Sequence, residues 1–267
     1  MMARASLAAR VVGSGVLAFL MLPILAVIPA SFNHASFIRL PPAQVSLRWY
    51  QAFFADPEWL RALWTSLEVA IATTLIAVVL GTLTALGLER VTPRLRAVIV
   101  GLVLSPLIVP VIMISIALYY VMRPIGLHGT VVGLALGHTL LALPFVVINV
   151  GLSLKGIDPN CLRAAAGLGA SAWRTFWTVT FPLIIPGLAG GAAFAFVTSF
   201  DEVVISIFLA GSQAKTLPVK MWEIMRVEFT PVTAVASTLF LAVTVVLFAA
   251  VHFLRARTAV SGEPDGR

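Results

Sequence analysis

Residues 131–154 read Val-Val-Gly-Leu-Ala-Leu-Gly-His-Thr-Leu-Leu-Ala-Leu-Pro-Phe-Val-Val-Ile-Asn-Val-Gly-Leu-Ser-Leu, with no acidic side chain, lysine or arginine. A helix of about 20 mostly apolar residues crosses the hydrocarbon core of a bilayer, so this run is long enough to span one. Its apolar residues do not alternate with polar ones, as they would in a strand of a membrane barrel. Because a spanning backbone must satisfy its own hydrogen bonds, the run predicts a transmembrane α-helix.

The rest of the chain has the same character. Of its 267 residues, 60% are hydrophobic and 11% are charged, whereas about a quarter of a soluble domain is charged. We predict an all-α membrane protein with six transmembrane helices: Val11–Ala30, Leu63–Leu88, Ala97–Val121, Val131–Leu154, Leu183–Leu209 and Pro231–Leu254. The first run is longer than the roughly 7–15-residue core of a signal peptide, so we expect it to be retained.

Charge predicts the orientation of these spans. With both termini placed inside, the inner segments contain 11 of the 18 basic residues but only four of the 11 acidic ones. The basic residues are Arg4, Arg10, Arg90, Arg94, Arg96, Lys155, Arg163, Arg174, Arg255, Arg257 and Arg267; the acidic ones are Glu89, Asp158, Glu263 and Asp265. Such an excess marks the cytoplasmic side. We therefore expect both termini to be cytoplasmic, and interpret the net charge of +7 as an orientation signal rather than affinity for nucleic acid.

No pattern for catalysis or metal binding is present in the sequence. Cys161 is the only cysteine, and the four histidines (His34, His128, His138 and His252) lack the spacing of metal ligands. Each histidine is expected to be packed or interfacial. The stretch Gly211-Ser-Gln-Ala-Lys-Thr lacks the second glycine of a phosphate-binding loop, so we expect no ATP hydrolysis, and no cofactor, in this chain.

The longest inner connection, residues 155–182, has helix signals of its own. Asp158-Pro159 predicts a capped helix start, and Gly167 and Gly169 predict its end. Ser171 is expected to begin a second short helix that ends near Pro182. Two such helices would present a knob of small residues that could insert into a cleft on a partner protein.

The same loop resembles the EAA loop of ABC importer permeases. The matching residues are Ala164, Ala165, Leu168, Gly169, Ala170, Ser171, Phe176, Pro182, Pro186 and Gly187, while Arg163 stands where the pattern has glutamate. The resemblance implies that Arg163, Ala164, Ala165, Leu168, Gly169, Ala170 and Phe176 contact an ATPase subunit. The alternative is an ordinary amphipathic surface loop.

Further stretches resemble the spermidine/putrescine branch of these permeases, and its second (C-type) subunit in particular. They are Ser199-Phe-Asp-Glu-Val-Val204, Gly211, Thr216-Leu-Pro-Val-Lys-Met-Trp222 and Ala236-Ser-Thr238. The resemblance implies a type I importer permease fold in residues 60–254. We expect an N-terminal helix and an outer amphipathic segment in 1–59, and a cytoplasmic tail in 255–267. It also implies a bacterial inner-membrane location, a second permease subunit as dimer partner, two ATPase subunits that bind ATP and Mg²⁺, and a periplasmic binding protein.

Two adjacent acids lie in the outer half of the fifth predicted span. On one continuous helix, Glu202 would share a small, polar stripe with Thr198 and Ser206, whereas Asp201 would lie on a bulky apolar stripe. Because acids inside a membrane are costly, we predict that both line the passage of an amine cation, with Glu202 the more exposed to it. The alternative is a structural pair satisfied by Lys215, Lys220 or Arg226. Glu68, in the second span, is explained by reaching towards the outer interface.

Other functions remain open. The same importer class could carry ferric iron, an aminophosphonate, an opine or thiamine, because the loop indicates contact with an ATPase and carries no information on the cargo. A secondary transporter coupled to ions through the membrane acids, or a membrane scaffold without transport activity, would not need an ATPase contact.

Overall fold

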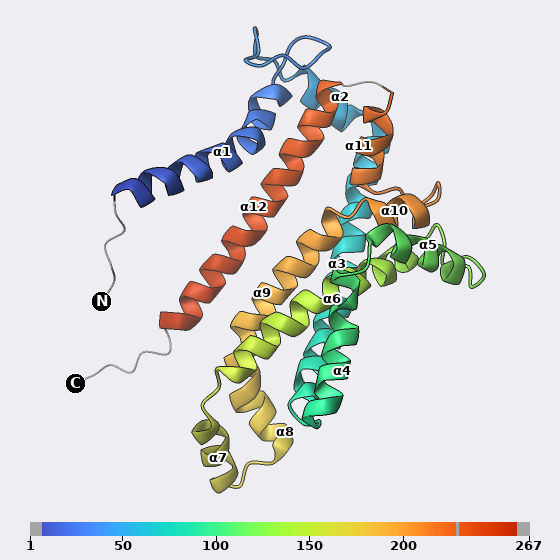
Figure 1. Cartoon of the computed structure of the whole chain (residues 1–267). Helices are drawn as coiled ribbons and strands as arrows, with labels where there is room; N and C mark the ends of the chain where they lie inside the picture. The colour runs from blue at the N-terminus through green and yellow to red at the C-terminus, as the bar shows by residue number, and fades with distance from the viewer. Residues whose placement is uncertain (1–6, 228–229, 261–267) are drawn as a thin grey trace. The chain divides into compact units, whose positions relative to one another are not determined.

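The computed structural model describes residues 7–227 and 230–260, and the regular elements of that part are helices (Figure 1). Five of these helices are long and apolar enough to span a membrane, and one bent pair of helices could form a sixth span. The predicted membrane class is therefore confirmed. Arg4, Glu263, Asp265 and Arg267, which the charge prediction used, lie outside the described residues.

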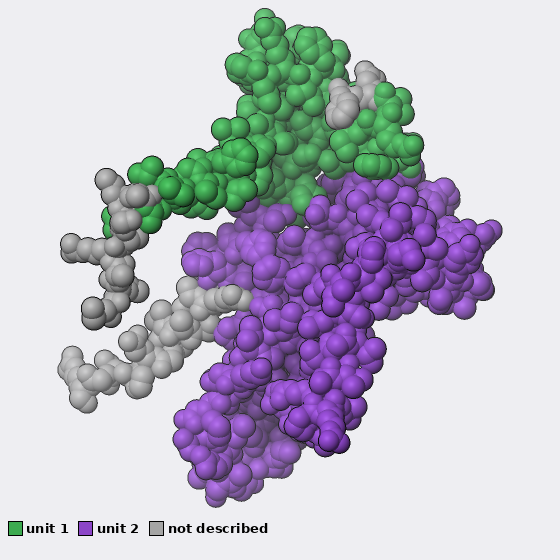
Figure 2. Space-filling model, in the orientation of Figure 1, with its two compact units in different colours: residues 1–60, 220–243 green, residues 61–219, 244–267 purple. Residues whose placement is uncertain are grey.

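Contacts divide the chain into two units, residues 1–60 with 220–243 and residues 61–219 with 244–267 (Figure 2). The first unit contains α1 (Leu7–Ser31), α2 (Arg48–Ala55) and the first turn of α3 (Pro57–Leu88). It also contains most of α11 (Leu217–Met225) and the first part of α12 (Pro231–Val260). The Asp56 carboxylate accepts a hydrogen bond from the Glu58 amide at 2.8 Å and thereby caps the start of α3.

The second unit is built around α6 (Val131–Lys155) and α9 (Phe181–Phe200), which pack against each other. Glycines on α9 allow this close approach. A Cβ atom on Gly187 would lie 2.7 Å from the Asn149 carbonyl oxygen, and one on Gly191 would lie 3.0 Å from the Val146 Cα. Small residues four positions apart are a common way for membrane helices to bring their backbones together.

The third predicted span, Ala97–Val121, is not one straight helix. It consists of α4 (Pro93–Leu104), a 3₁₀ turn, η1 (Ser105–Leu107), and α5 (Val111–Met122), with a bend of 98° between the two halves. Pro106 and Pro110 cause the break, because proline has no N–H for the helix ladder and Pro110 adopts an extended backbone with ψ 126°. After the bend, α5 packs against α10 (Val204–Leu209).

The fifth predicted span is wrong at both ends. α8 (Ala172–Thr175) continues through a π-helical turn, Phe176–Thr180, into α9, so that one helix extends over Ala172–Phe200 and does not stop near Pro182. The wide turn accommodates Pro182, which lies in the first turn of α9. At its other end the helix stops at Phe200 instead of Leu209, and α10 is a separate helix.

Candidate functional site

The loop with the predicted coupling residues forms two helices joined by a sharp turn, here called the α7–α8 elbow (residues 156–175). Asp158 caps α7 (Pro159–Gly167) by accepting a hydrogen bond from the Asn160 amide at 2.8 Å. Ser171 caps α8 by accepting one from the Arg174 amide at 3.3 Å. Gly169 between them has φ +76°, a left-handed conformation that favours glycine. The two predicted helix starts and the glycine turn are thus confirmed.

The surface of the elbow carries more than the small residues that we predicted. Leu168 is 88% exposed and Trp173 is 71% exposed. Arg163 is also exposed, and its guanidinium donates a hydrogen bond to the Asn160 side-chain oxygen at 2.6 Å. Of the other predicted coupling residues, Ala164 and Gly169 are exposed, whereas Ala165, Ala170 and Phe176 are half-buried. An exposed leucine and tryptophan beside an arginine form a surface suited to a protein partner.

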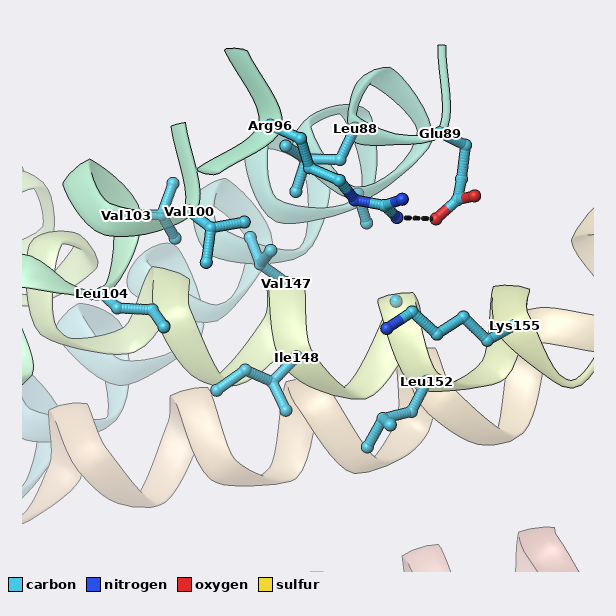
Figure 3. Close-up of a pocket in the computed structure, with 12 residues that line it drawn as sticks. Leu88, Glu89, Arg96, Val100, Val103, Leu104, Val147, Ile148, Leu152 and Lys155 are labelled. Atoms are coloured by element: carbon cyan, nitrogen blue, oxygen red, sulfur yellow. Dashed lines mark hydrogen bonds and ion pairs between the residues drawn. The ribbon is translucent and has the colours of Figure 1, made fainter. Parts of the chain in front are cut away.

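The elbow lies at the basic end of the second unit. A cavity of about 190 Å³ opens there between α4 and the C-terminal parts of α3 and α6 (Figure 3). Glu89 and Arg96 form an ion pair at its rim, and Lys155, the last residue of α6, also lines it. Side chains from connections that were predicted to be cytoplasmic therefore meet at one end of this unit.

The other end of the α6–α9 pair contains a buried polar cluster: Thr73, His138, Ser199, Glu202 and Ser206. The His138 side chain lies between two serines, with Nδ1 2.9 Å from the Ser199 hydroxyl and Nε2 3.0 Å from the Ser206 hydroxyl. The Ser199 hydroxyl donates to the Thr73 hydroxyl at 3.1 Å, and Thr73 donates to the Ala135 carbonyl at 3.2 Å. The cluster therefore joins α3, α6, α9 and α10.

The hydroxyl groups of this cluster determine which atoms donate and which accept its hydrogen bonds. Because Thr73 donates to Ala135 and Ser199 donates to Thr73, the Ser199 oxygen is left to accept from His138 Nδ1–H. On the other side of the ring, Nε2 lies 3.0 Å from the Ser206 hydroxyl, which donates its proton to the Glu202 carbonyl oxygen at 3.0 Å. Each donor of the cluster thus has an acceptor, as buried polar groups require. The predicted packed histidine is confirmed at His138, which is 1% exposed.

Glu202 uses its carboxylate to begin α10. One oxygen accepts from the Val204 amide at 2.9 Å, and the other accepts from the Ser206 amide at 3.0 Å. The second oxygen also lies 3.6 Å from His138 Nε2. These contacts take up amides at the start of a helix, which explains why α9 and α10 do not form one continuous helix.

The break changes the surroundings that we expected for the two acids. Glu202 is 8% exposed, and Asp201, at the end of α9, is exposed. Within this chain Glu202 is therefore less exposed than Asp201, because the helical stripe ends at Phe200. That both acids line the passage of a cation stays a prediction. Thr198 is half-buried and Ser206 is fully buried.

The structure also shows the surroundings of Glu68, the third membrane acid, and of Lys220, one of the basic partners considered above. Lys220 pairs with Glu58 rather than with either acid of the Asp201–Glu202 pair. Glu68 is exposed, as expected for a side chain that reaches an interface.

Sequence reasoning missed the cluster as a unit. His138 is the one titratable side chain in an otherwise uncharged 24-residue run, and such a residue needs polar partners inside a membrane. That signal predicts partners but not their positions, because Thr73 and Ser199 are 126 residues apart in the chain.

Comparisons with known proteins agree with this fold. Residues 77–260 match the family described as "Binding-protein-dependent transport system inner membrane component". The chain is 30% identical over 250 residues to the spermidine/putrescine transport system permease protein PotC of Shigella flexneri, a match that covers 93% of this chain and 94% of that protein. It is 31% identical over 230 residues to the molybdenum transport system permease protein ModB of Mycobacterium tuberculosis, covering 79% and 86%.

A solved structure has the same architecture. A chain of the bacterial alginate ABC transporter, in complex with an alginate pentasaccharide-bound periplasmic protein, superposes with a TM-score of 0.72 at 16% identity, covering 94% of each chain. The extent of the family match and the identity to PotC decide the classification. The chain belongs to the family of inner-membrane components of binding-protein-dependent transport systems.

Proposed function

We propose that this chain is one of two permease subunits in an ATP-driven importer of polyamines such as putrescine and spermidine. A periplasmic binding protein delivers the cargo, and two ATPase subunits bind ATP and Mg²⁺ at the cytoplasmic face. Both termini lie in the cytoplasm. This chain forms part of the passage and performs no ATP hydrolysis itself.

The exposed carboxylate of Asp201 is the observation that carries the choice of cargo. The 20 residues of α9 rise about 30 Å, roughly the thickness of the hydrocarbon core. Asp201 at the end of α9 is therefore close to the membrane face opposite the elbow, where an imported cation enters. An acid at this position attracts a polyamine, and the name of PotC supports the same cargo.

The α7–α8 elbow supports the proposed link to the ATPase. It connects α6 directly to the helix that continues into α9, so a push on the elbow reaches both. Its exposed Leu168 and Trp173 supply apolar contact, and Arg163 supplies a charge. Closure of the ATPase subunits around ATP would move the elbow and shift the spans between two states.

The relative ModB raises a second cargo, molybdenum, which is an oxyanion in neutral water. An oxyanion would be repelled by Asp201, so the exposed acid favours the cationic cargo. Ferric iron, an aminophosphonate, an opine and thiamine are offered as labelled cargo to the same cells.

The deciding experiment is uptake of labelled putrescine and spermidine by cells that lack this gene and every other polyamine importer, with and without the gene restored. We expect uptake only in the restored cells, abolished by orthovanadate. Vanadate-insensitive uptake would indicate an ion-coupled transporter. Restored uptake of labelled molybdate without polyamine uptake would overturn the proposed cargo while retaining the importer class.

A further inference from the structure

Asp201 and Glu202 are neighbours in sequence but differ in their surroundings. Asp201 caps the end of α9, is exposed, and makes no ion pair within the described residues. Glu202 is 8% exposed, and both of its carboxylate oxygens accept amide hydrogen bonds from the first turn of α10. The two carboxylates therefore cannot perform the same task in this conformation.

We propose that the two acids have different roles, a division in which Asp201 contacts the cationic cargo. Glu202, together with His138, is a positioning residue that holds the α9–α10 turn and keeps Asp201 exposed. This inference rests on the proposed function, because it assumes a polyamine cargo.

Glu202 is unavailable to cargo because of its hydrogen bonds. To turn towards a passage, its carboxylate would have to release the partly buried Val204 amide and the buried Ser206 amide, and both would lose this partner. A charged acceptor makes such bonds stronger than those between neutral groups. The same bonds fix the backbone immediately after Asp201.

His138 extends this support to the neighbouring helices. Its side chain contacts Ser199 on α9 and Ser206 on α10, the two elements that flank Asp201. The Ser206 hydroxyl lies 3.0 Å from the Glu202 carbonyl oxygen as well, so the turn is held through both its side chain and its backbone. A shift of α6 against α9 would therefore move the turn that presents Asp201.

Cysteine accessibility tests the division directly. In a Cys161→Ser background, each of Asp201→Cys, Glu202→Cys and Ser212→Cys is treated in membrane vesicles with a cationic methanethiosulfonate reagent. Ser212 is exposed in the loop after α10, so the thiol introduced there is the matched labelling control.

The expected rates of reaction with the reagent follow from the exposure of each introduced thiol. We expect the thiol at position 201 to react at least about tenfold faster than the thiol at position 202, because reagents reach exposed thiols first. Equal labelling at positions 201 and 202 would overturn the proposal.

Because Glu202→Cys removes the cap and could disturb folding, uptake by isosteric variants provides an independent measurement. Per copy of protein in the membrane, we expect Asp201→Asn to reduce spermidine uptake about tenfold, since it removes the charge that attracts the cation. Glu202→Gln keeps one accepting oxygen and should retain about half of the uptake. An equal loss in both variants would contradict this expected difference and refute the division.

The positioning role has its own measurement. In the Asp201→Cys protein, adding Glu202→Ala should change the labelling rate of the introduced thiol, because the turn is no longer fixed. An unchanged labelling rate would mean that Glu202 does not position its neighbour. Failure of the proposed function is distinguishable, since the unaltered transporter would then not import polyamines at all.

Discussion

Replacing Gly187 of α9 by alanine tests whether close glycine packing holds the α6–α9 pair together. A Cβ atom added there would lie 2.3 Å from the Ser153 hydroxyl oxygen and 2.7 Å from the Asn149 carbonyl oxygen. The serine can rotate, but the carbonyl belongs to the α6 backbone and cannot. The two helices would therefore have to move apart to reach an ordinary contact distance.

The expected cost follows from the general behaviour of overpacked cores. Inserting a methyl group into a closely packed interface costs about 1–3 kcal/mol of folding free energy. Glycine to alanine in a helix also gains about 1 kcal/mol from helix propensity, so the two effects must be separated. Gly151→Ala on α6 provides this control, because an added Cβ there meets nothing within 4 Å.

The assay is reversible unfolding of the purified chain by sodium dodecyl sulfate in detergent micelles, followed by far-ultraviolet circular dichroism. We expect Gly187→Ala to be less stable than Gly151→Ala by about 1–3 kcal/mol, with Gly191→Ala also less stable than the control. Equal stability of Gly187→Ala and Gly151→Ala would refute the reasoning, since it would show that the helices are not in the close contact described.

Three further predictions concern the α7–α8 elbow. Asp158→Ala removes the cap of α7 and should cost about 1 kcal/mol locally, seen as faster amide exchange in α7; exchange at the unaltered rate would contradict the capping role. Gly169→Val forces a branched side chain into a backbone with φ +76°, which costs at least about 1–2 kcal/mol of folding free energy. This variant should lower ATP-coupled uptake more than the control Gly167→Ala, where an added Cβ meets nothing within 4 Å. Arg163→Glu should reduce the amount of ATPase that copurifies, because we expect the partner to be adapted to a guanidinium; increased recovery would indicate a basic residue opposite this position.

Local features of the chain were predictable from the sequence because they depend on residues close together in it. The uncharged run at 131–154 predicted a spanning helix and is found as α6. Asp158, Ser171 and Gly169 predicted the caps and the turn of the elbow, since a cap contacts an amide only two or three residues away. The continuation of α8 into α9 was missed because a π-helical turn gives no clear sequence signal.

The break after Phe200 and the burial of Glu202 depended on the tertiary structure. Val204 and Ile205 continue the apolar pattern of a spanning helix, so periodicity alone extends the helix to Leu209. The helix ends because Glu202 captures the amides of Val204 and Ser206, while His138 from α6 holds Ser206 from the other side. Such a cluster joins residues from four helices, and hydrophobic periodicity carries no information on which helices become neighbours. The sequence by itself therefore determined the membrane class and the local shape of the elbow, whereas helix packing alone decided which acid remained exposed.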